Sequence, residues 1–221
     1  MLRHLTTAAL TLIAADSATA APKAWTLDLG HAHLGWEIDH MLLSKTVGRF
    51  NDFDGTFLID EEDPTNSQIT ITVNPASIDS NHVGRDNHLR NEDYFNVAAF
   101  PTATFTSTEI EMMTPSSGKL HGALTMLGVT APVTLDFTMM RDTTYPAFIP
   151  NYDEVRVVAF EATGTIERLD WGMDFIAFLG SPTGLEVALD IHLDLIDCAG
   201  AAPTNVPCNW GRVDGFTGPS E

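Results

Sequence analysis

The sequence predicts an all-β fold, and two observations carry this prediction. Apolar and polar residues alternate over several stretches, most clearly over residues 185–195. A strand that alternates in this way buries one face and turns the other toward water. Turn-forming residues recur between these stretches, so the chain reverses direction often. This pattern is typical of an antiparallel sandwich or a closed barrel.

The predicted strands follow one another along the chain. In the first, one face carries Ala32, Leu34, Trp36, Ile38 and His40, and the opposite face carries His31, His33, Glu37 and Asp39. The apolar faces of the next two carry Ile69, Ile71 and Val73, and then Val133, Leu135, Phe137 and Met139. The last, residues 185–195, would span about 36 Å at roughly 3.3 Å per residue. Turns are predicted at Asp54 and Gly55, at Asp63 and Pro64, at residues 115–118, at Leu127 and Gly128, and at residues 181–184.

Helix is scarce in this sequence. Residues 81–92 are the best candidate, because Ser80 or Asn81 could cap the first turn and Arg85 and Leu89 stand one turn apart. A second short helix is predicted over residues 39–44, at the end of the first long strand.

The first 20 residues have the pattern of an export signal. Arg3 precedes a short apolar run over residues 8–15, and a small-x-small site ends at Ala20, where cleavage is expected. The apolar run is shorter than the roughly 20 residues that cross a bilayer. We therefore expect an exported, soluble protein that begins near residue 21.

The chain is strongly acidic, with a formal net charge of -19. Removal of the signal leaves this charge unchanged, because Arg3 and Asp16 are lost together. Such a charge repels nucleic acids and anionic membrane surfaces. The remaining length suits one domain with a buried core.

The two cysteines, Cys198 and Cys208, lie in the tail that follows the last predicted strand. An even number of cysteines in an exported chain predicts a disulfide. By loop entropy the bridge would add about 2.5 to 3 kcal/mol, and it would staple the tail rather than the barrel.

Several blocks of the sequence carry a resemblance to a known family. They are HAHLGWEIDHMLLSKTVGRFNDFDG, SIDS, RDNHLR, DYF, FPTATF, GALTMLGVTAPVTL and ERLDWGM. Together they resemble the YceI-like family of periplasmic, lipocalin-like barrels that hold a polyisoprenoid or isoprenoid-quinone chain. The resemblance implies an eight-stranded antiparallel barrel over residues 21–196, one or two short helices against its flank, and a periplasmic location. Residues 197–221, the tail, lie outside it.

A barrel of this size either fills its interior or leaves a cavity for one small ligand. For a lipid chain, the candidate apolar lining residues are Trp36, Ile38, Phe50, Phe53, Phe57, Leu89, Phe95, Phe105, Leu124, Met126, Phe137 and Trp171. At the mouth, Arg85, His88 and His40 could receive a quinone or phosphate head group. The candidate partners of His40 itself are Arg85, Asp86 and His88. If Arg85 instead pairs with Asp86 or Glu92, it only pins the helix to the barrel.

Two alternatives stay open at this point. His31 and His33 could present two imidazoles to a metal from one strand face, with Glu37 or Asp39 as a third ligand, as in a metal-dependent hydrolase. A filled barrel would instead be structural or stress-protective. The sequence shows neither a nucleophile elbow nor a cysteine placed for catalysis, so we expect no enzyme.

The expected ligand is the lipid itself, for example a ubiquinone-like molecule, with no other cofactor and no nucleic acid. A homodimer and a transient contact with a membrane or a quinone enzyme are the partners considered.

Overall fold

The computed structural model describes residues 21–149, 152, 155–175, 177, 183–199 and 208. The predicted export signal and most of the tail lie outside the described residues. The strands are β1 (Lys23–Leu27), β2 (His33–His40), β3 (Ser44–Phe50), β4 (Phe53–Ile59), β5 (Gln68–Val73), β6 (Ile78–Asp79), β7 (Ala103–Thr114), β8 (Ser117–Met126), β9 (Val129–Thr144), β10 (Arg156–Glu167) and β11 (Thr183–Ile196). The short helices are α1 (Val83–Leu89) and the 3₁₀ turns η1 (Leu29–His31), η2 (Pro64–Asn66), η3 (Pro75–Ser77) and η4 (Arg168–Trp171).

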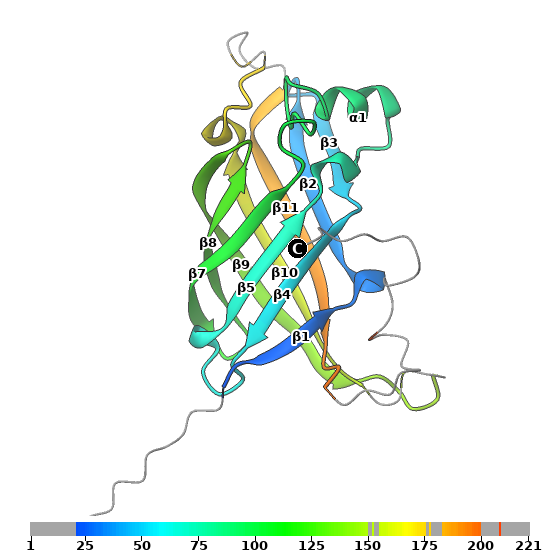
Figure 1. Cartoon of the computed structure of the whole chain (residues 1–221), viewed down its shortest axis with the longest axis vertical. Helices are drawn as coiled ribbons and strands as arrows, with labels where there is room; N and C mark the ends of the chain where they lie inside the picture. Colours follow the sequence, from blue (N-terminus) through cyan, green and yellow to red (C-terminus); the bar gives the residue numbers. More distant parts are fainter. Residues whose placement is uncertain are drawn as a thin grey trace, which may run out of the picture.

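Antiparallel pairing closes the sheet into a barrel (Figure 1). The strands follow the order β1, β4, β5, β7, β8, β9, β10 and β11, and β11 pairs back to β1. This confirms the predicted eight-stranded antiparallel barrel. Closure removes the edges that an open sheet would expose.

The last strand, β11, pairs with two different strands along its length. Near its end, Ile196 and Leu195 pair with β1, whereas its earlier residues pair with β2. The 3₁₀ turn η1 shifts the chain from β1 to β2, and β3 and the two-residue β6 extend the sheet from there. The ring of eight strands is thus closed directly by β1 at one end only.

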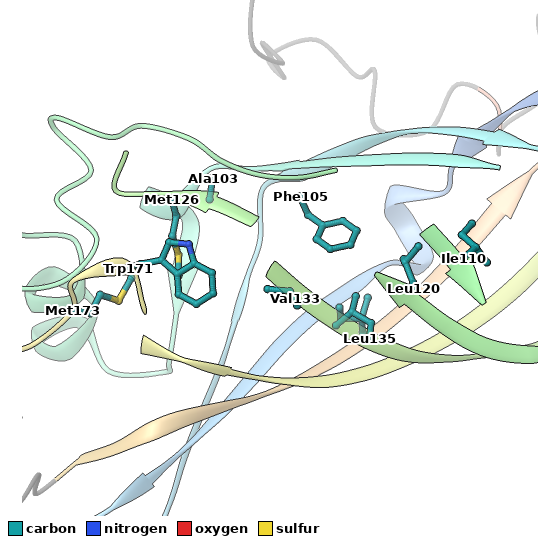
Figure 2. Close-up of a cluster of buried hydrophobic side chains, with 10 residues drawn as sticks. Ala103, Phe105, Ile110, Leu120, Met126, Val133, Leu135, Trp171 and Met173 are labelled. Atoms are coloured by element: carbon teal, nitrogen blue, oxygen red, sulfur yellow. The ribbon is translucent and has the colours of Figure 1, made fainter. Parts of the chain in front are cut away.

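Side chains fill this closed end. Trp25 and Leu27 of β1 pack with Phe53 and Phe57 of β4 and with Leu195 of β11. A second cluster follows β7, β8 and β9 toward the other end, where Trp171 lies beside Met126 and Met173 (Figure 2). The core therefore continues along the barrel wall.

A buried polar cluster lies where β1 passes into η1, next to the closed end. The carboxylate of Asp28 is fully buried and accepts hydrogen bonds from the Gly30 N–H, the His31 ring and the Tyr145 hydroxyl, at 2.9, 2.9 and 3.1 Å. Burial and the nearby Asp28 charge raise the pKa of Tyr145, so its hydroxyl stays a donor at neutral pH.

The predicted disulfide between Cys198 and Cys208 is confirmed, with 5.6 Å between the two Cα atoms. Both cysteines pack against Val155, Val157 and Ile196. The bridge joins two residues of the tail, as expected, and in addition packs that part of the tail against the closed end of the barrel.

The helix expected over residues 81–92 is shorter and has a different cap. Asn81 has a φ of 60°, outside the extended conformation that a helix cap adopts, and His82 takes this position. The ring nitrogen Nδ1 of His82 accepts the Arg85 N–H at 3.0 Å. Histidine is not a usual helix cap, so the sequence favoured Ser80 or Asn81 at this position.

The helix predicted over residues 39–44 is wrong, because this segment is the tight turn of the β2–β3 hairpin. The Leu43 N–H donates to the His40 carbonyl at 3.0 Å. Met41 and Leu42 have left-handed φ angles of 55° and 57°, which cost roughly 1 to 2 kcal/mol each. The continuous pairing of β2 with β3 imposes this turn.

The turn predicted at Asp54 and Gly55 is also wrong, since both residues lie inside β4. A Cβ atom at Gly55 would come within 2.6 Å of the Phe57 ring. The glycine makes room for a core side chain and does not mark a turn.

Candidate functional site

A cavity of about 450 Å³ lies inside the barrel, in the half where β2 pairs with β11. This volume is in the range of roughly 300 to 1,000 Å³ that is usual for small-molecule sites. Its wall is apolar and comes from β2, β5, β7, β8, β9 and β11, including much of the cluster in Figure 2. The interior is therefore hollow in one half and filled in the other.

The polar side chains of the lining lie mostly around one end of the cavity, which we call the mouth. They are His40, Thr46, Arg85, His88, Tyr94, Arg168 and Thr183. The β2–β3 hairpin, α1 and the segment after it, η4 and the start of β11 supply them. Figure 1 shows α1 at this end of the barrel.

Most of the lining residues predicted from the sequence border the cavity. These are Trp36, Ile38, His40, Phe50, Arg85, His88, Leu89, Phe95, Phe105, Leu124 and Met126. Their contact with a ligand stays a prediction.

The other predicted residues lie elsewhere. Phe53 and Phe57 belong to the filled end of the barrel. Phe137 packs against the second cluster, outside the cavity lining. Trp171 is buried in that cluster, and its Nε1–H donates to the Leu124 carbonyl at 3.0 Å. Asp86 is buried at the start of α1.

Arg85 and Asp86 both bind Ser80, the residue after β6. The Arg85 guanidinium donates to the Ser80 hydroxyl at 2.7 Å and to its carbonyl at 2.6 Å. Asp86 accepts the Ser80 N–H at 2.9 Å and also its hydroxyl. Arg85 thus pins α1 through Ser80, while its side chain also borders the mouth.

The two histidines of the mouth differ in their surroundings. His88 Nε2 lies 2.9 Å from the Asp93 carboxylate, and its ring contacts those of Tyr94 and Phe175 edge-on. His40 is exposed at the end of β2. In the described part of the chain it forms no hydrogen bond with Arg85, Asp86 or His88. It lies at the rim of the cavity, exposed to solvent.

Arg168 is a lining residue that the sequence reasoning missed. It is only 3% exposed. Among the described residues, its N–H groups donate to the carbonyls of Gly184, at 3.0 Å, Phe175, at 3.4 Å, and Met173. All of these acceptors are neutral. No carboxylate of the described residues is bonded directly to Arg168 to neutralise its charge. The sequence signal for Arg168 was its place in ERLDWGM, one of the blocks that resemble the YceI-like family.

Two buried polar atoms of the lining residues have no hydrogen-bond partner among the described residues. They are Nε1 of Trp36 and Oγ1 of Thr183. Leaving such a group unpaired costs roughly 1 to 3 kcal/mol, so each is suited to meet a polar ligand atom or a water molecule. Thr183 pairs with His40 across β11 and β2, which puts it at the mouth.

The expected histidine pair does not share a strand face. His31 lies in η1 and contacts Asp28, whereas His33 begins β2 and its ring faces that of His192. Within the described ranges, no group of three or more His, Cys, Asp or Glu side chains could hold a metal ion. In the same residues, no helix combines the length and the apolar character needed to span a membrane.

Comparison with known proteins agrees with this architecture. The chain is 38% identical over 188 residues to the protein YceI of Salmonella newport, covering 85% of this chain and 93% of that protein. The crystal structure of BcnA from Burkholderia cenocepacia aligns with a TM-score of 0.65 and 20% identity, over 76% of this chain and 98% of that one.

A further solved structure is a polyisoprenoid binding domain from Saccharophagus degradans implicated in plant cell wall breakdown. It aligns with a TM-score of 0.57 and 15% identity, over 78% of this chain and 98% of that one. At such identities the two solved structures show the fold alone. Residues 25–195 match the YceI-like domain, which covers more than half of the chain. The chain therefore belongs to the YceI-like family.

Proposed function

We propose that this protein binds an isoprenoid lipid in the periplasm and sequesters or carries it, without catalysing a reaction. The prenyl chain would lie in the apolar cavity and the head group at the mouth. One observation carries the proposal: the cavity is hollow and apolar along its wall, and its polar side chains gather mostly at one end. A ligand with a long apolar chain and one polar end matches this distribution.

Burial of the chain alone could supply the affinity. Each buried CH₂ group contributes about 0.8 kcal/mol, which amounts to about 4 kcal/mol for one isoprene unit. A few units would exceed the cost of ordering ligand and side chains. The polyisoprenoid binding by the Saccharophagus degradans domain supports the same class of ligand for this chain.

The mouth suits a head group with oxygen acceptors. Arg168 brings a buried positive charge, and Thr183 brings a hydroxyl without a partner among the described residues. The exposed ring of His40 lies beside Thr183 in the strand register. These groups can donate to a quinone carbonyl or to a polyprenyl phosphate, the two head groups that we propose.

The test compares two neighbouring positions of β8. Leu124 faces the cavity and Thr125 is exposed on the opposite face. A carboxylate among apolar side chains costs several kcal/mol. Leu124→Glu should therefore abolish lipid co-purification, whereas Thr125→Glu should retain it. Organic extraction and native mass spectrometry of protein prepared without detergent give the readout.

Circular dichroism of both variants serves as the control for folding. A folded Leu124→Glu variant that keeps its lipid would contradict binding in this cavity. Absence of any lipid from the unchanged protein, followed by no uptake of added prenyl alcohols or quinones, would contradict the ligand class.

A further inference from the structure

The turn between β2 and β3 exposes three consecutive large apolar side chains. Met41, Leu42 and Leu43, which we call the tip, are 53%, 92% and 80% exposed. Val83, the first residue of α1, is 76% exposed. Single apolar residues on a surface are ordinary, but a continuous run at the end of a projecting hairpin marks a surface that contacts something apolar.

The tip lies at the mouth of the cavity. His40 and Thr46, on either side of it along the hairpin, both line the cavity. Val83 precedes Arg85, another residue of the mouth, by two positions. Figure 1 shows the β2–β3 hairpin and α1 at the same end of the barrel. Whatever contacts the tip is therefore next to the opening.

The backbone of the tip opposes the residues that occupy it. Both Met41 and Leu42 have left-handed φ angles. Hairpin turns with two such residues favour asparagine and glycine. Neither side chain is buried, so packing within the barrel does not offset this strain. The apolar residues are thus unfavourable for the fold at this turn, which indicates that they act outside it.

Charge and area together identify what the tip contacts. Residues 40–49 contain Lys45 and Arg49 and no carboxylate, in a chain with a net charge of -19. Lys45 binds Asp39 at 2.9 Å and lies 3.4 Å from Glu37, so the base of the hairpin is close to neutral. A zwitterionic lipid surface carries no net charge and does not repel this acidic chain, and an apolar tip with a nearly neutral base can enter it without burying an unpaired charge. Four side chains present too little area for a stable dimer, which buries roughly 1,200 Å² or more.

We propose that residues 41–43 insert into the surface of a lipid bilayer and hold the mouth of the cavity against it. The proposal rests on the proposed function, because a bilayer is where an isoprenoid lipid would be collected or released. Insertion requires only the tip, and the strands behind it remain outside the membrane.

The experiment replaces the tip by the turn that the backbone prefers. A variant with Met41→Asn, Leu42→Gly and Leu43→Ser should melt no lower than the unchanged protein, because strain is removed. Its bound fraction on phosphatidylcholine vesicles, measured by flotation, should fall by about tenfold. The matched control is Phe148→Ser, since Phe148 is 83% exposed and follows β9 at the closed end, where Tyr145 contacts Asp28. Flotation of this control should not change.

Binding of farnesol in buffer without vesicles separates this proposal from the proposed function. Equal farnesol binding by the unchanged protein and the tip variant, with loss of flotation only in the variant, supports both. Loss of flotation in the variant without farnesol binding by either protein supports insertion and overturns the ligand class. Equal flotation of both proteins, or no flotation of either, overturns insertion. If the unchanged protein is a dimer, the tip variant is a monomer and neither protein floats, the tip contacts a second copy of the chain. That result also overturns insertion.

Discussion

Gly48 shows how a single residue fixes the wall of the cavity. It pairs with Trp36 across β2 and β3. A Cβ atom at this position would lie 2.2 Å from Cζ2 of the indole and 2.8 Å from the Asp79 carbonyl oxygen. The indole of Trp36 can lie across the strand only because Gly48 has no side chain. The shape of the cavity beside Trp36 thus depends on a residue that contributes no lining atom itself.

Gly48→Ala should therefore both destabilise the protein and change the cavity. Overpacking of this kind costs roughly 1 to 3 kcal/mol, and displacement of the indole should lower lipid retention. Urea unfolding and lipid extraction measure the two effects. Gly84→Ala is a suitable control, because its nearest neighbour is the ring of His82 at 3.2 Å and alanine favours a helix. Equal stability of Gly48→Ala and the unchanged protein would contradict this account of the wall.

Among the elements, alternation identified strands well but did not locate residues along the barrel axis. Trp36 and Phe57 were both assigned to the interior, and both are buried there. Only Trp36 borders the cavity, since Phe57 lies at the filled end. Alternation distinguishes the inside from the outside, whereas depth depends on how strands are staggered around the ring. A sequence contains no local signal for that stagger.

Loops and caps were harder to predict, for a related reason. The left-handed turn at Met41 and the cap at His82 contradict the preferences of those residue types. The burial of Arg168 was not predicted either, because its acceptors are backbone carbonyls of Met173, Phe175 and Gly184, and a carbonyl leaves no mark in the residue type. Tertiary pairing decides these features, and local preference does not.

The connection from β4 to η2 is held by one carboxylate, which makes it sensitive to pH. Asp60 accepts the N–H groups of Asp63 and Glu62 at 2.9 and 3.0 Å and the amide of Asn66 at 3.3 Å. The backbone N–H of Asp63 is the main cause that holds the pKa of Asp60 below its ordinary 3.8, against the opposing effect of burial. An acid with a lowered folded pKa stabilises the fold above its unfolded pKa.

Asp60→Asn should therefore lower the melting temperature near neutral pH. The difference from the unchanged protein should shrink as the pH falls below about 4 and through the folded pKa, because the carboxyl group then becomes neutral in both states of the unchanged protein. Thermal melts over this pH range measure the effect. A deficit that stays constant down to acid pH would show that the substitution acts through packing and not through charge.

The molecule as a whole joins a filled half to a hollow half. The filled half combines direct closure by β1 and β11 with a cluster of aromatic side chains. At the other end, β6 pairs with β3 over only two residues, and the seven-residue α1 lies beside it. Local opening requires less free energy where fewer buried contacts must be broken.

Amide hydrogen exchange should accordingly differ between the two halves. We expect slow exchange in β1 and in the end of β11 that pairs with it, and faster exchange in β3, β6 and α1. Binding of an added isoprenoid should slow exchange in β3, β6 and α1 and leave exchange in β1 and the end of β11 unchanged. Mass spectrometry of peptic fragments with and without ligand measures this. Protection that appears first in β1 would contradict binding at the hollow end.

The change of β11's partner from β1 to β2 determines the end of the barrel through which a ligand can enter. Because aromatic side chains fill one half of the barrel, a ligand enters and leaves the cavity through the mouth. Under the proposed function, an isoprenoid enters with its hydrocarbon tail first, and its polar group stays at the rim. Whatever next receives the lipid meets that polar group first and can draw the molecule out by it. Under the proposed function, a molecule that is polar at both ends should bind more weakly, because one of its polar ends would be buried among apolar side chains.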